Sequence, residues 1–110
     1  MNTTELKEYQ LNKNNLYREE MFTDLSIGGI IRYTPVTPDG SIDKTRKPVF
    51  YGKVSIITQM GPIPIQTVIQ AKDLQQAIKL FPETMKAAIE KFMEEVRKIE
   101  QQKQSRIIVP

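Results

Sequence analysis

The chain has 110 residues, of which 39% are hydrophobic and 26% are charged, and its formal net charge is +3. This size and balance suit a single globular domain. The sequence contains no cysteine and no histidine. It therefore excludes disulfides, thiolate nucleophiles, histidine general bases and imidazole metal ligands. The positive charge is scattered along the chain, which argues against a dedicated nucleic-acid binder.

Residues 1–21 are polar and rich in Asn, Gln, Lys and Glu. Asn12, Asn14 and Asn15 interrupt a ragged helical stripe, because asparagine is a poor helix former. We therefore predict an N-terminal arm that is partly ordered at most, followed by one α+β domain over residues 22–110. We expect a cytoplasmic protein, because the first residues lack the apolar core of a signal segment and no apolar run reaches the ~18 residues of a membrane span.

Residues 25–34 predict the first strand, because apolar and polar side chains alternate there. The alternation places Ile31 and Tyr33 toward the core, and Ile30 and Arg32 on the opposite, outer face of the sheet.

Two further strands are predicted after the turn-rich connection over residues 35–48. Residues 49–60 and 63–71 alternate clearly, and the reversal at Gly61 makes them an antiparallel hairpin. Pro64 cannot donate a ladder hydrogen bond, so the third strand should lie at an edge of the sheet. The predicted strand order is therefore 1-2-3.

The last part of the chain has the spacing of an amphipathic helix. Asp73 is a suitable N-cap, and Pro82 removes a helix hydrogen bond. We therefore predict a short helix over residues 74–80, a break, and a long C-terminal helix over residues 82–103. The β-rich residues near the end predict a short C-terminal β tail that pairs with a sheet edge. The predicted fold is α+β, with a three-stranded antiparallel sheet, both helices packed on one face, and this tail.

No set of residues indicates catalysis. The serines lack a nucleophile motif and a histidine to activate them, and the acidic residues near turns lack the spacing of a calcium loop. Turn formation and helix capping explain these acidic residues. We therefore predict a protein that is not an enzyme and that carries no cofactor and no metal.

A basic group of residues is a candidate site for an anion or for single-stranded nucleic acid. Basic side chains beside an exposed aromatic ring are how sheets bind single strands, although charge that protects a sheet edge is the other interpretation. The candidate contacts are Arg32, Lys44, Arg46, Lys47, Tyr51 and Lys53.

Self-association is the leading expectation. The apolar seam of the long helix has the rhythm of a coiled coil over about two heptads, and the chain carries more apolar surface than one helix and one sheet can hide. A homodimer or higher oligomer follows, and its candidate contacts are Ile30, Ile57, Met93, Ile107, Ile108 and Val109.

The triplet Leu80-Phe81-Pro82, which opens a helix after an antiparallel sheet, and the apolar segment that ends at Pro110 are similar to the export chaperone SecB. The resemblance implies a four-stranded sheet that carries a long helix, and an oligomer that binds unfolded chains in apolar grooves.

Three functions are therefore open. The first is a non-catalytic protein that acts through protein–protein contacts and self-association. The second is an anion or single-stranded nucleic-acid binder. The third is a SecB-like holder of extended polypeptide segments. The sequence names no partner.

Overall fold

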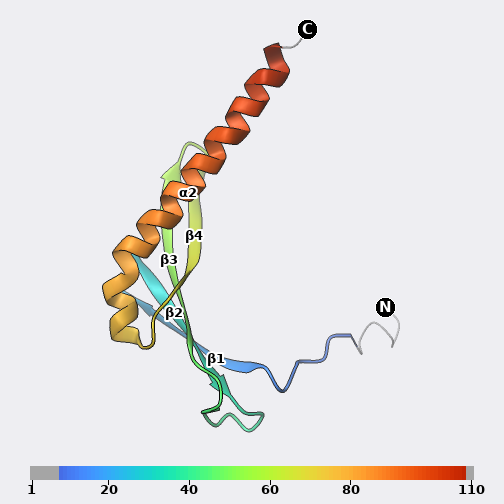
Figure 1. Ribbon diagram of the computed structural model, residues 1–110, viewed down its shortest axis with the longest axis vertical. Helices are drawn as coiled ribbons and strands as arrows, with labels where there is room; N and C mark the ends of the chain where they lie inside the picture. Colours follow the sequence, from blue (N-terminus) through green and yellow to red (C-terminus); the bar gives the residue numbers. More distant parts are fainter. Residues whose placement is uncertain (1–7, 109–110) are drawn as a thin grey trace.

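The computed structural model describes residues 8–108, with the side chains of residues 8–102. The fold is α+β, as predicted, with one antiparallel sheet and one long C-terminal helix (Figure 1). In the described part of the chain, no helix is long and apolar enough to cross a membrane. The elements are β1 (Leu16–Thr23), β2 (Gly28–Val36), β3 (Val49–Thr58), β4 (Gly61–Ile69) and α2 (Leu74–Ile108).

The sheet has four strands in the order β1-β2-β3-β4, so the prediction of three strands is wrong. The additional strand, β1, lies largely within the residues assigned to a polar arm. Its side chains are mostly exposed because, among the described residues, α2 packs on β2, β3 and β4 and not on β1, so its sequence has no strong apolar alternation. Ladder hydrogen bonds to β2 hold it in place, together with the ion pair between Arg32 and Glu20.

The first predicted strand begins three residues later than expected, at Gly28. Residues 24–27 form a turn in which Leu25 has a φ of 60°. The Asp24 side chain accepts hydrogen bonds from the backbone N–H groups of Ser26, Ile27 and Gly28. These three bonds stabilise the turn against extension of β2.

The hairpin of β3 and β4 and the edge position of β4 are as predicted. The predicted order 1-2-3 also places the strand that corresponds to β2 at an edge. In the structure β2 is an inner strand, because β1 pairs with it.

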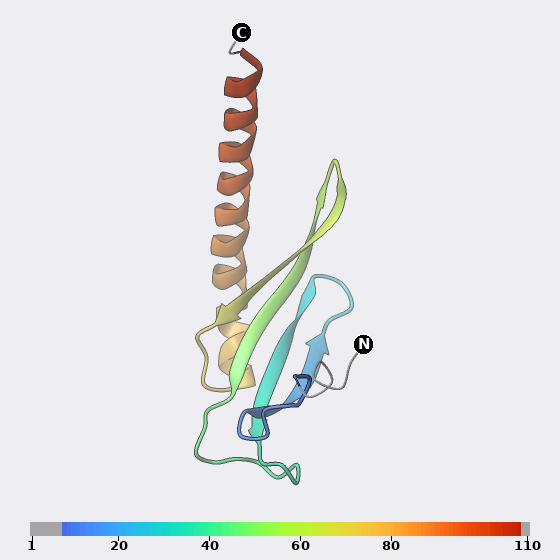
Figure 2. The ribbon, with the colours of Figure 1, turned by 90° about the vertical axis from the view of Figure 1, so that its right-hand side faces the viewer.

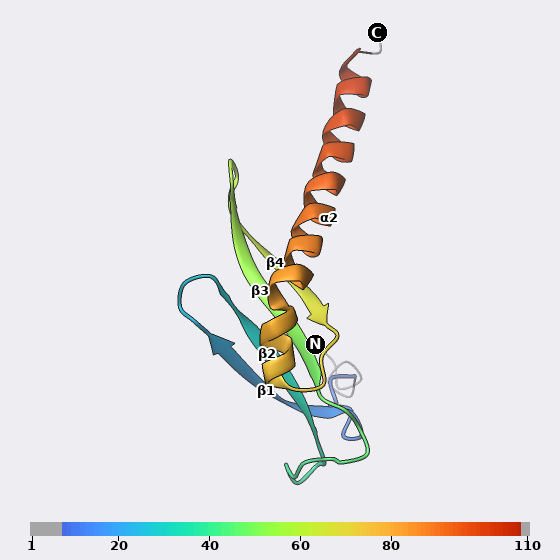
Figure 3. The same cartoon turned by 60° about the vertical axis from the view of Figure 1, so that its left-hand side comes forward.

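The helix α2 covers the face of the sheet that carries Ile30, Phe50 and Ile69 (Figure 3). Ile30 is 5% exposed and stands opposite Gly52 in the register, so its predicted position on the outer face is wrong. The error follows from the turn, because the sequence pattern counted Leu25 and Ile27 as strand residues.

A second group of buried side chains continues the core along the helix. Val54 and Ile65 of the sheet lie against Met85 of α2, and Ile89 and Phe92 pack at its margin. Gly52 leaves room for the helix here, because a Cβ at this position would lie 2.6 Å from the sulfur of Met85 and would force that side chain to move. The helix therefore approaches β3 more closely than a larger residue would permit.

The helix is continuous from Leu74 to Ile108, so the predicted break at Pro82 is wrong. Its N-terminus is capped as expected: the N–H of Gln76 donates to the Asp73 carboxylate, and the Gln76 side chain accepts from the N–H of Lys72. The first turns are inclined to the rest of the helix (Figure 3). Burial of the seam on both sides of Pro82 offsets the missing hydrogen bond.

The predicted β tail is also wrong for the residues that the structure describes. Ile107 and Ile108 are the last residues of α2 rather than part of a strand. Val109 lies outside the described residues.

Candidate functional site

The C-terminal half of α2, residues 93–108, projects beyond the sheet (Figures 1 and 2). We call this segment the distal half. At ~1.5 Å per residue, a helix of 35 residues is ~52 Å long. The last helix residue that packs against the core is Phe92, so the helix extends well past the core. The apolar seam continues past this point through Val96 and Ile99. Met93 is 46% exposed, Ile99 is 53% exposed and Val96 is half-buried, so much of the apolar stripe of the distal half lies open to solvent.

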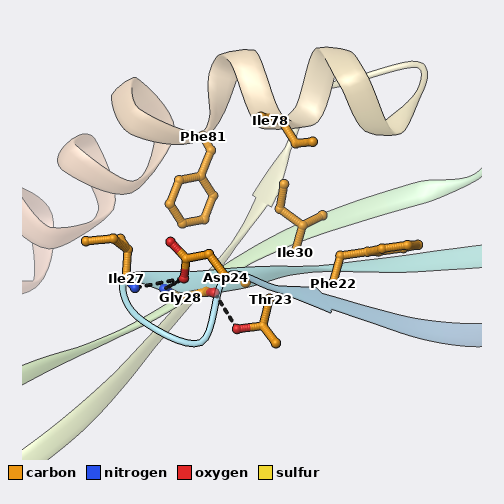
Figure 4. A pocket seen from close by; sticks show the side chains of 9 residues that line it. Phe22, Thr23, Asp24, Ile27, Gly28, Ile30, Ile78 and Phe81 are labelled. Carbon is orange, nitrogen blue, oxygen red and sulfur yellow. Dashed lines mark hydrogen bonds between the residues drawn. The ribbon is translucent and has the colours of Figure 1, made fainter.

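An apolar groove of about 430 Å³ lies between the first turns of α2 and the β1–β2 hairpin (Figure 4). Ile78 and Phe81 come from the helix, and Phe22, Ile27 and Ile30 come from the sheet side. Ile27 and Ile78 are exposed at its rim.

The Asp24 turn closes one end of this groove. The backbone N–H groups that bind the Asp24 carboxylate lower its pKa, so the turn keeps its hydrogen bonds at neutral pH.

The β1–β2 turn also borders a hollow on the outer face of the sheet, with a volume of about 450 Å³. Ile57 is 89% exposed there, and Met21 and Leu25 are exposed beside it. Of the predicted oligomer contacts, Ile57 and Met93 are thus exposed, and Ile30 is buried. The side chains of Ile107 and Ile108 are not among those described.

The structure does not bring the six predicted basic and aromatic contacts onto one face. Arg32 stands opposite Phe50 and therefore lies on the helix side of the sheet, whereas Tyr51 and Lys53 lie on the outer face. The predicted position of Arg32 on the outer face is wrong for the same reason as that of Ile30. Lys47 is exposed in the β2–β3 connection.

Arg32, Lys44 and Arg46 do line one pocket of about 380 Å³ beside the start of α2, which we call the polar pocket for its charged side chains although its walls are largely apolar. Two further basic residues of this pocket, Arg18 and Lys72, were not predicted from the sequence. Arg18 belongs to β1, which was not predicted, and Lys72 reaches the pocket through the turn before the helix.

Within this pocket, Arg46 holds the sheet together. Its guanidinium donates to the carbonyl oxygens of Leu16 and Val36 at 3.0 and 2.9 Å and to the Asp43 carboxylate at 3.0 Å, and it lies over the Tyr17 ring. The bond with Asp43 raises the pKa of Arg46. Arg46 thus joins the start of β1 to the end of β2, which is a structural role.

A row of three tyrosines crosses the outer face of the sheet. The rings of Tyr17 and Tyr33 and those of Tyr33 and Tyr51 meet edge to face, with centroids 6.3 and 5.6 Å apart. The Tyr33 hydroxyl donates to Glu19 at 2.9 Å, and this bond raises the pKa of the tyrosine. Ile31 is buried and stands opposite Tyr51 in the register, and the Tyr51 ring meets Tyr33, so the predicted aromatic contact Tyr51 is a packing residue as well.

Among the described residues, no group of three or more acidic side chains is arranged to hold a metal ion. No family model, no curated protein and no solved structure matches this chain.

Proposed function

We propose that this is a non-catalytic cytoplasmic protein that acts through protein–protein contacts, beginning with the association of two copies through the distal half of α2. The observation that carries the proposal is the apolar stripe of Met93, Val96 and Ile99, which continues the seam of the helix beyond the last core residue and leaves Met93 and Ile99 about half exposed and Val96 half-buried. Two such helices can cover each other as in a coiled coil, because the spacing of the seam is that of a and d positions.

Charge favours an antiparallel pair. With Val96 at an a position and Ile99 at a d position, Glu95 and Glu100 occupy g and e positions. A parallel pair would set Glu95 of each copy against Glu100 of the other on both flanks, and like charges at this spacing are destabilising. An antiparallel pair in which Val96 meets Ile99 of the second copy avoids these two contacts.

Light scattering on the intact chain tests the association. The expected result is a dimer at tens of micromolar, and a monomer after the double substitution Val96→Ser and Ile99→Ser. Glu94→Ser is the matched control, since Glu94 lies on the polar side of the same turns and should leave the dimer intact. A chain that ends at Gln104 should also remain dimeric, because it retains the stripe.

Two results would refute the proposal: a monomeric intact chain, or a dimer that survives the double substitution. Cysteine cross-linking then tests the orientation, because the chain has no cysteine of its own. A mixture of Val96→Cys and Ile99→Cys chains should form the mixed disulfide in preference to either homodimer. A dominant Ile99→Cys homodimer would indicate the parallel pair.

A second candidate function is the SecB-like holding of extended polypeptide segments. The apolar groove between α2 and the β1–β2 hairpin supports it, and the four strands agree with the architecture that the resemblance implies. Binding of a permanently unfolded polypeptide, measured by fluorescence anisotropy, should weaken in Ile78→Glu, because Ile78 is an exposed residue of the groove rim. Equal binding by the parent chain and by Ile78→Glu would count against this function.

A further inference from the structure

The polar pocket beside the start of α2 collects more positive than negative charge. The pocket is built by β1, β2, the β2–β3 connection and the residues just before the helix. Two of its lining residues, Asp43 and Asp73, are acidic. Its basic residues come from four different segments of the chain and are Arg18, Arg32, Lys44, Arg46 and Lys72.

The two acidic residues of the pocket already have partners. Asp43 accepts hydrogen bonds from the Thr45 hydroxyl at 2.6 Å and from Arg46, and these bonds lower its pKa to about 2. Asp73 accepts from the N–H of Gln76 and caps the helix. Neither carboxylate pairs with a lysine in the described part of the chain.

The two arginines on the sheet share a single carboxylate. Nε and Nη2 of Arg32 donate to Glu20 Oε1 at 3.2 and 3.0 Å, and Nε of Arg18 lies 3.4 Å from the same oxygen. One negative charge thus orients two positive ones, and the arrangement retains an excess positive charge. The Arg18 side chain is about half exposed, at 51%.

Lys44 and Lys72 bring two further ammonium groups to the same pocket, and neither forms an ion pair within residues 8–102. Both side chains are exposed and therefore able to turn toward a ligand. Thr34 adds a hydroxyl to the lining, and Ile42, Pro48 and Leu74 add apolar walls.

We propose that this pocket binds a phosphorylated small molecule, with its phosphate held by Arg18, Lys44 and Lys72 and its organic part against the apolar walls. A phosphate carries up to two negative charges and several acceptor oxygens, which suits three cationic groups that approach from different segments. The volume of about 380 Å³ falls within the range of small-molecule sites, which is ~300–1,000 Å³.

Isothermal titration with inorganic pyrophosphate tests the site, with sodium chloride of equal ionic strength as the salt control. We expect saturable binding by the intact chain and a loss of about tenfold or more in affinity in the double variant Lys44→Gln and Lys72→Gln, because two charge-assisted hydrogen bonds are removed. The matched control is Lys47→Gln with Lys53→Gln, which removes the same charge outside the pocket and should change the affinity less than about twofold.

Three results would overturn the proposal: no binding of millimolar pyrophosphate, equal weakening in the pocket and control variants, or unchanged affinity in the pocket variant. Arg18→Gln serves as a second pocket variant, and urea unfolding of all variants confirms that each is folded. A single-stranded oligonucleotide is the competitor. If the oligonucleotide binds the pocket variant and the parent chain equally well and does not displace pyrophosphate, nucleic-acid binding belongs to another surface. If the oligonucleotide binds and pyrophosphate does not, the small-molecule site is refuted.

Discussion

The two halves of α2 have the same apolar spacing and opposite surroundings. In residues 74–92 the stripe packs on β3 and β4, and Met85 is only 3% exposed. In the distal half the stripe is much more open: Val96 is half-buried, and Ile99 is more than half exposed. The period of a helix thus reveals which side is apolar and leaves open what covers that side. A sheet that is shorter than its helix leaves apolar side chains of the helix exposed without any change in the sequence pattern.

The largest expected effect contrasts two methionines, one in each half. Met85→Ala should reduce the free energy of unfolding by about 2–5 kcal/mol, because it leaves a cavity among Val54 and Ile65. Met93→Ala should cost less than about 0.5 kcal/mol in dilute solution, because Met93 is half exposed. Urea unfolding of both variants measures the difference. Similar losses in the two variants would mean that the halves do not differ in burial as described.

The next effect tests how closely the first half of the helix approaches the sheet. Gly52→Ala places a methyl group against Met85 and should cost about 1–3 kcal/mol through overpacking. The double variant Gly52→Ala with Met85→Ala should lose less free energy of unfolding than the sum of the two single losses, because the new methyl group enters the cavity. A double-mutant cycle by urea unfolding provides the coupling energy. Strict additivity would show that Gly52 and Met85 are not in contact.

The fold class, the β3–β4 hairpin and the helix cap could be predicted because each depends on a local signal. Alternation, a turn glycine and Asp73 with Gln76 act within a few residues. The missing strand β1 gave no such signal, because an edge strand that is mostly exposed can be polar along its length. The predicted break at Pro82 is wrong for the converse reason. A local helix breaker is tolerated inside a helix where packing on both sides of it is favourable.

The candidate sites depended on contacts that are distant in sequence. Ile30 and Arg32 were assigned to the wrong face because Leu25 and Ile27, which lie in the turn at Asp24, were counted as strand residues on the core face. Lys44 and Arg46 were predicted as contacts of a basic site. That Arg18 lines the same pocket follows only from the position of β1, which the sequence did not reveal.

A smaller effect is a pH dependence of stability that arises at the sheet end of the molecule, in the connection between β2 and β3. The acidic residues whose pKa is lowered include Asp39 and Asp43, both to about 2, in the connection between β2 and β3. Because the pKa in the unfolded chain is higher, near 3.8, their contribution to stability is complete above about pH 4 and is lost as the pH falls toward 2. Urea unfolding between pH 5 and pH 2 should show this decline, and Asp43→Asn should make it shallower. An equally steep decline in the variant would remove Asp43 from the explanation.

The smallest expected effect on the folded chain belongs to Ile99→Ser in the distal half. In dilute solution its free energy of unfolding should lie within about 0.5 kcal/mol of the parent chain, because no part of the sheet packs on this position. The difference should appear on concentration: if two copies associate, the Tm of the parent chain rises with protein concentration, and the Tm of the variant rises less. Calorimetry over a hundredfold range of concentration measures both slopes. A loss of more than about 1 kcal/mol in dilute solution would mean that the chain itself covers Ile99, and a parent Tm that does not depend on concentration would mean that nothing covers it.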